Sequence, residues 1–215
     1  MRTHVGRLLP VVALLLALGG CSSTYYAAWE KLGYQKRDIL VARVRDARND
    51  EEAAKKQFQT TLQRFEEVTH FNGGDLEAEY NKLNTDYVSS ETRAADVRKR
   101  IASVETVAGD LFTEWQGELS QYSNPDLRKS SEQKLNDTKI RYQKLLDSMK
   151  AAEQRMQPVL TAFHDQVLFL KHNLNAQAVA SLQTTAAGIN TDVAKLIADM
   201  EKSIAEADSF ISQMK

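Results

Sequence analysis

The chain is poor in the residues that turn or cross-link a polypeptide. Its 215 residues include nine Gly, three Pro and one Cys. So few turn-forming residues argue against a strand-rich fold, which needs many tight turns. A single cysteine excludes an intramolecular disulfide, so the fold depends on side-chain packing. The formal net charge is only −1, whereas nucleic-acid-binding domains have an excess of Lys and Arg. We therefore expect no nucleic-acid partner.

Motifs for catalysis and metal binding are also missing from the sequence. It contains no nucleophile elbow, no phosphate-binding glycine loop and no zinc-binding cysteine pattern. The Glu-x-x-His spacing of di-iron bundles occurs once, at Glu67 and His70, whereas a di-metal centre needs two copies. We therefore expect no enzyme, no catalytic residues, no cofactor and no metal centre.

The first twenty residues have the pattern of an export signal. Arg2 and Arg7 precede the uncharged apolar run 8–18, which is too short to span a bilayer as a helix. The run 18–21 (Leu-Gly-Gly-Cys) resembles a bacterial lipobox, in which Cys21 is acylated and becomes the mature first residue. The alternative is an ordinary secretory peptide with a cysteine there by chance. We predict a lipoprotein signal peptide (1–20), a lipidated tether (21–24) and one helical bundle domain (25–215).

Several acyl chains on one cysteine hold a protein durably on a membrane. The resemblance to Gram-negative lipoproteins implies anchoring in the outer membrane facing the periplasm, and anchoring in the inner membrane is the alternative. Aromatic and basic side chains close to the lipid suit a membrane interface. We assign to this interface Tyr25, Tyr26, Trp29 and Lys31. The alternative, compatible with the first, is that the aromatic residues pack against Trp115 and Tyr122.

From residue 25 onward, apolar residues recur every three or four positions, as on one face of a helix. Breaks at Asn72–Asp75, Ser123–Pro125 and Asn173–Asn175 contain helix-stopping or helix-capping residues. They divide the chain into the segments 25–71, 76–122, 126–172 and 176–214. The third break lacks Gly and Pro, so a continuous final helix is the alternative.

The three longest segments have equal lengths, and at 1.5 Å per residue each would form a rod about 70 Å long. Matched lengths and short connections favour antiparallel neighbours. We predict an all-α fold, an elongated antiparallel four-helix bundle made of two hairpins of coiled-coil-like helices. In the first stripe, Glu51 is the one interruption, yet it precedes Lys55 by the four positions typical of a surface ion pair. We expect Glu51 to face outward.

An antiparallel bundle places the first and third breaks at the same end, away from the lipid. Four residues at this end are candidates for an interaction site: His70, Phe71, His172 and Asn173. They could form a docking tip or a weak two-histidine metal site. The alternative is two ordinary loops that hold polar residues.

Several stretches resemble the uncharacterised bacterial family named domain of unknown function 2959. They are residues 34–41 (YQKRDILV), 73–76 (GGDL), 79–84 (EYNKLN) and 166–176 (QVLFLKHNLNA). The resemblance implies a helical, coiled-coil-like envelope lipoprotein of Gram-negative bacteria. It brings no known activity and no catalytic residues.

We therefore expect a non-catalytic structural or interaction scaffold in the periplasm. It would be bound to the membrane through lipid on Cys21, with an envelope protein as partner and homo-oligomerisation as a further option. The alternative is a binding module that holds an apolar or lipid ligand between its helices. Small residues of the stripes could leave room for it: Ala94, Ala108, Ala152 and Ala186.

Overall fold

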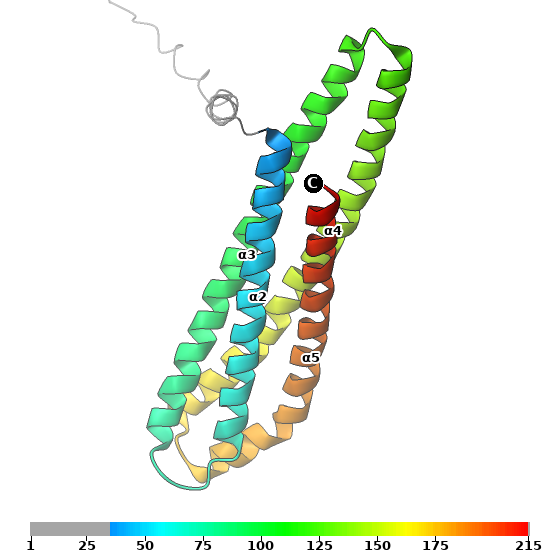
Figure 1. The fold of residues 1–215 in the computed structure, drawn as a ribbon. Helices are drawn as coiled ribbons and strands as arrows, with labels where there is room; N and C mark the ends of the chain where they lie inside the picture. The colour runs from blue at the N-terminus through cyan, green and yellow to red at the C-terminus, as the bar shows by residue number, and fades with distance from the viewer. Residues whose placement is uncertain (1–34, 215) are drawn as a thin grey trace, which may run out of the picture.

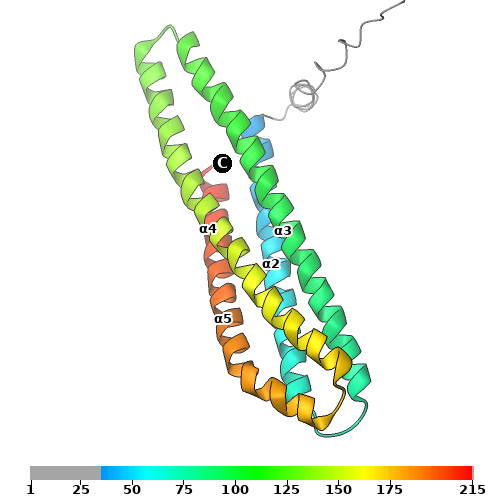
Figure 2. The same ribbon diagram turned by 180° about the vertical axis from the view of Figure 1, so that it is seen from behind.

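The computed structural model describes residues 35–214, a range without β-strands. Its helices are α2 (Lys36–Thr69), α3 (Leu76–Glu118), η1 (Leu119–Gln121, one turn of 3-10 helix), α4 (Pro125–His172) and α5 (Ala176–Gln213). The four long helices run alternately down and up an elongated rod (Figures 1 and 2). Both α2 and α4 pack against α3 and α5, so the helices form a closed ring in cross-section. The predicted antiparallel four-helix bundle is confirmed.

Each connection forms where the sequence places a capping residue. Gly73 and Gly74 have φ angles of 150° and 116°, which side chains other than glycine rarely adopt. Asp75 then caps α3 by accepting a hydrogen bond from the backbone of Ala78 (3.0 Å). Asn124 caps α4 in the same way, with Pro125 in the first turn. Asn175 caps α5, so the break between the third and fourth segments is real.

Two helices end two or more residues earlier than the periodicity predicts. α2 ends at Thr69 rather than residue 71, because the chain leaves helical geometry at His70. α3 ends at Glu118 rather than residue 122, and η1 tightens its last turn. The apolar stripe continues past both ends, so the pattern alone could not mark them. The predicted part of the first helix before residue 35 lies outside the described residues.

The core runs the length of the rod and is built from the predicted stripes. Phe65 of α2 and Phe163 of α4 are both fully buried, and their rings meet edge to face with centroids 6.4 Å apart. Nearer the other end, the ring of Tyr142 contacts those of Phe112 (5.4 Å) and Phe210 (6.5 Å). Aromatic contacts therefore join all four helices through the core.

Ion pairs lie along all four seams between neighbouring helices. They include Arg100–Asp50 for α2–α3 (2.6 Å), Arg48–Asp208 for α2–α5 (3.1 Å), Arg98–Glu153 for α3–α4 (2.7 Å) and Lys144–Glu206 for α4–α5 (2.7 Å). Each exposed pair contributes about 1 kcal/mol or less. Their main consequence is register, because each pair forms only when its two helices are correctly aligned.

At one end of the rod, the end of α3, η1 and the start of α4 extend beyond α2 and α5 as a two-helix projection (Figure 1). The indole of Trp115 donates a hydrogen bond to Ser131 (2.8 Å), and Tyr122 remains 41% exposed. Tyr25, Tyr26 and Trp29 lie outside the described residues, so their predicted packing on this projection stays a prediction. In residues 35–214, no helix is long and apolar enough to cross a membrane.

Candidate interaction site at the distal end of the bundle

The distal end is the end formed by the α2–α3 loop (70–75) and the α4–α5 turn (173–175). It lies opposite the end at which α2 begins (Figure 1). A side chain of α5 connects this helix to the end of α2, because Gln183 donates a hydrogen bond to the backbone oxygen of Thr69 (2.7 Å). His70, Phe71, His172 and Asn173 all lie at this end, and their predicted role in an interaction stays a prediction.

Two of these four side chains are engaged in ending a helix. Nδ1 of His70 lies 2.8 Å from the backbone oxygen of Glu66. A carbonyl oxygen only accepts, so this nitrogen carries the imidazole proton in that contact. The side chain of Asn173 donates to the backbone oxygen of Phe169 (2.9 Å). In the described range, no cluster of three or more His, Cys, Asp or Glu residues could hold a metal ion.

A pocket of about 390 Å³ lies between the α2–α3 loop and the first turns of α5. Its lining residues are Phe71, Asn72, Gly73, Ala176, Val179, Ala180 and Gln183. The pocket is thus lined by one aromatic ring, small apolar groups and two amides, with no titratable side chain. Of the four predicted residues, Phe71 lines the pocket and the other three do not. A surface of this kind suits an uncharged side chain of a partner.

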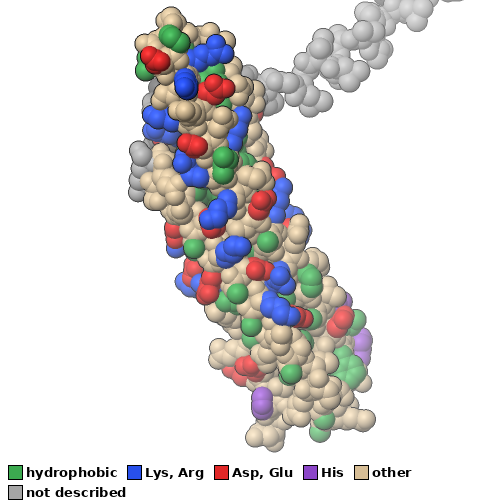
Figure 3. Space-filling view, turned by 90° about the vertical axis from the view of Figure 1, so that its right-hand side faces the viewer, with side chains coloured by type: hydrophobic (Ala, Val, Ile, Leu, Met, Phe, Trp, Pro, Cys, Tyr) green, Lys and Arg blue, Asp and Glu red, His purple; other side chains and the backbone are tan. Residues whose placement is uncertain are grey.

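The α5 side of the distal end lacks charge. Residues 172–191 contain no Asp, Glu, Lys or Arg, although 27% of the whole chain is charged. Three large apolar side chains are exposed nearby: Leu168 (46%), Phe169 (40%) and Leu174 (40%). Figure 3 shows charges of both signs along the rod but few at its lower end, where uncharged polar side chains and backbone, drawn in tan, surround some hydrophobic and histidine side chains. Loss of charge is the compositional mark of the centre of a protein interface.

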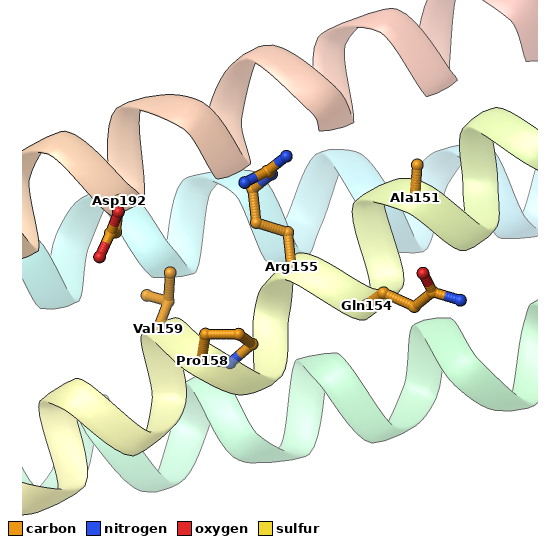
Figure 4. A pocket seen from close by; sticks show the side chains of 6 residues that line it. All are labelled: Ala151, Gln154, Arg155, Pro158, Val159 and Asp192. Atoms are coloured by element: carbon orange, nitrogen blue, oxygen red, sulfur yellow. The ribbon is translucent and has the colours of Figure 1, made fainter.

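A second pocket, of about 360 Å³, lies on the α4–α5 seam around Pro158 (Figure 4). Proline has no N–H, so it leaves the carbonyl of Gln154 without its helical partner. Arg155 and Asp192 also line this pocket, and Arg155 is paired with Asp199. These polar groups do not suit an apolar ligand.

The small residues expected to leave room between the helices do not line either of these pockets. Ala94, Ala108 and Ala152 are buried in the core, and Ala186 packs against it. Their small size is therefore accounted for by close helix packing, as in a coiled coil.

Glu51 occupies a core position that the sequence analysis assigned to solvent, so that prediction is wrong. Its side chain is fully buried, and its carboxyl accepts a hydrogen bond from the hydroxyl of Ser203 (2.9 Å). Lys55 pairs instead with Glu52 (3.1 Å) and Glu201 (3.8 Å). Burial raises the pKa of Glu51 to about 8, and the hydrogen bond from Ser203 opposes that shift. Its place in the apolar stripe was the signal that could have found it.

The remaining predicted site residues, Cys21, Tyr25, Tyr26, Trp29 and Lys31, lie outside the described residues. A family model described as "Protein of unknown function (DUF2959)" matches residues 25–214. No curated protein and no solved structure matches the chain.

Proposed function

Because the chain belongs to the DUF2959 family, whose function is unknown, we propose a function from the geometry of its bundle. The protein is a lipid-anchored, non-catalytic spacer of the bacterial envelope, and its distal end binds a protein partner. Lipid on Cys21 holds it at the outer membrane, facing the periplasm. The lipobox pattern supports the anchor, and the charge-free surface of residues 172–191 supports the partner site.

The length of the rod supports a spacer. α4 has 48 residues, which at 1.5 Å per residue span about 70 Å. Residue 21 precedes α2, and α2 begins at the end opposite the distal pocket. An anchor on Cys21 would therefore hold the pocket far from the membrane, where a periplasmic or cell-wall-associated protein can bind it.

The chemistry of the distal pocket favours binding over catalysis. Its lining supplies apolar contact and amide hydrogen bonds, without an acid, a base or a nucleophilic side chain. The observation that carries the proposal is that this pocket is lined in part by the charge-free stretch 172–191. A partner surface that is itself uncharged would bury these groups without leaving a charge unpaired.

A pair of matched variants tests the proposed site on the full-length protein in its own membrane. Ala180→Glu places a carboxylate beside the distal pocket, whereas Ala205→Glu places one on the charged part of the same helix. Both alanines are exposed, so neither change disturbs the core. Chemical crosslinking followed by quantitative mass spectrometry measures which envelope proteins each variant contacts.

We expect Ala180→Glu to lose at least one specific crosslinked protein that the wild type and Ala205→Glu retain. An unpaired carboxylate that is buried at an interface centre typically weakens binding by about 2 kcal/mol or more, roughly thirtyfold. Equal crosslinking in all three proteins, or no crosslinked partner at all, would refute the proposed site. Equal loss in both variants would place the partner elsewhere on α5.

A further inference from the structure

The seam between α2 and α5 is the one that no loop closes. The loop 70–75 joins α2 to α3, the turn after η1 joins α3 to α4, and the turn 173–175 joins α4 to α5. α2 and α5 are the first and last helices of the described range, so their seam depends on side-chain contacts alone. It is therefore the seam that can open without unfolding a connection.

Glu51 and Ser203 face each other inside this seam. Both side chains are fully buried, and the hydroxyl of Ser203 lies 2.9 Å from Oε1 of Glu51. Among the described residues, Oε2 of Glu51 has no hydrogen-bond partner although it is shielded from solvent. Glu51 is also the one buried side chain of a charged type in this range. The hydroxyl of Ser203 is thus the one hydrogen-bond donor to this carboxyl among the described residues.

The cations and anions around Glu51 are committed to other partners. On the same seam, Arg48 pairs with Asp208, and Lys55 pairs with Glu52 and Glu201. The charged groups of α3 and α4 near this level form the pairs Arg100–Asp50, Arg98–Glu153 and Arg155–Asp199. All of these pairs lie at the partly exposed edges of the seams. None supplies a positive charge inside the core, so a buried carboxylate here would be unpaired.

We propose that the protonation state of Glu51 controls the opening of the α2–α5 seam. The seam is closed while the carboxyl carries its proton. When solvent base removes that proton, the carboxylate is far more stable in water than in the core, so its ionisation favours opening of the seam. Opening exposes the apolar inner faces of α2 and α5, whereas the other seams stay closed because loops tether them.

The burial of Glu51 sets the pH range over which the seam opens. Burial raises the pKa of the closed form to about 8, whereas a solvated glutamate has its ordinary value of 4.5. Between these two values the opening equilibrium increases about tenfold for each pH unit, because opening is linked to the release of one proton. Above about pH 8 both forms are ionised, and the increase stops.

Hydrogen exchange of the full-length protein, measured by mass spectrometry between pH 5 and 9.5, tests the proposal. Glu51→Gln is the matched control, since it keeps the size and the oxygen that faces Ser203 but cannot ionise. Comparing the two proteins at each pH removes the intrinsic pH dependence of amide exchange. For peptides from α2 and α5, we divide the amide exchange rate of the wild type by that of Glu51→Gln. We expect this ratio to rise up to tenfold per pH unit and to level off near pH 8. In peptides from the α3–α4 seam the ratio stays near one.

A ratio that does not change with pH would overturn the proposal. A ratio that rises equally in all four helices would also overturn it, because this shows global unfolding rather than opening of one seam. Ser203→Ala provides a second variant that retains the carboxyl. The hydrogen bond from Ser203 lowers the pKa of Glu51, so its loss must move the plateau to higher pH. An unmoved or lowered plateau in this variant would contradict the role given to the Glu51–Ser203 pair.

Discussion

Removal of the Phe163 ring gives a quantitative test of the core. The ring is fully buried and meets the ring of Phe65 across the bundle, from α4 to α2. Phe163→Ala removes these contacts and leaves a cavity in the middle of a packed core. Changes of this type cost about 3–5 kcal/mol. For a domain of this size each kcal/mol lowers the Tm by about 2–4 °C, so we expect a decrease of about 10 °C.

Urea unfolding followed by circular dichroism measures this free energy directly. Ile140→Ala is the matched control, because Ile140 is 69% exposed on the same helix, and we expect a change within about 0.5 kcal/mol. A double-mutant cycle with Phe65→Leu and Phe163→Leu isolates the contact between the rings, which we expect to contribute about 0.5–1.5 kcal/mol. A cost below about 1 kcal/mol for Phe163→Ala, together with no coupling in the cycle, would refute the contact between Phe163 and Phe65 across the core.

The remaining predictions concern two glycines and the buried carboxyl. Gly74→Ala should destabilise the protein by about 1–2 kcal/mol, because its φ of 116° strains any residue with a Cβ. Gly109→Ala should stabilise it by about 0.5–1 kcal/mol, since the helix there has open space for a methyl group; thermal unfolding that shows the same sign for both variants would contradict this. Glu51, with its pKa raised from 4.5 to about 8, contributes stability that is complete below pH 4.5 and is lost as the pH rises to about 8. Relative to Glu51→Gln, the wild type should lose about 1.4 kcal/mol per pH unit in this range, about 5 kcal/mol in all. Parallel stability curves for the two proteins would show that the carboxyl is hydrated.

The connections of the bundle were predictable because their signals are local. Asp75, Asn124 and Asn175 each accept a hydrogen bond from a backbone N–H two or three positions later. A capping residue of this kind acts whatever the rest of the chain does. Glycine at positive φ is likewise a property of one residue. The number, order and direction of the helices therefore followed from short stretches of sequence.

The position of Glu51 was not predictable from its neighbours alone. Its spacing from Lys55 fits a surface ion pair, whereas its place in the apolar stripe fits the core. The partner that distinguishes the two, Ser203, lies 152 positions away. Lys55 in turn finds its carboxylates on Glu52 and on the distant Glu201. Contacts between helices decide such cases, and a periodic pattern contains no information about them.

The distal pocket required two segments that are far apart in the sequence. Phe71 belongs to the first loop, whereas Ala180 belongs to the last helix. The topology predicted that the loops share one end, but it could not show which side chains line the space between them. The charge-free stretch 172–191 could have been found by counting charges along the chain, and it points to the same end.

Whether the rod is attached at one end is tested most directly by the state of residue 21. Mass spectrometry of the N-terminal peptide, from protein extracted from bacterial membranes, reads this state without any variant. We predict a mature chain that starts at Cys21 and carries fatty acyl groups, with no peptide from residues 1–20. An intact leader, or a Cys21 without fatty acid, would contradict the anchor and with it the orientation of the distal end.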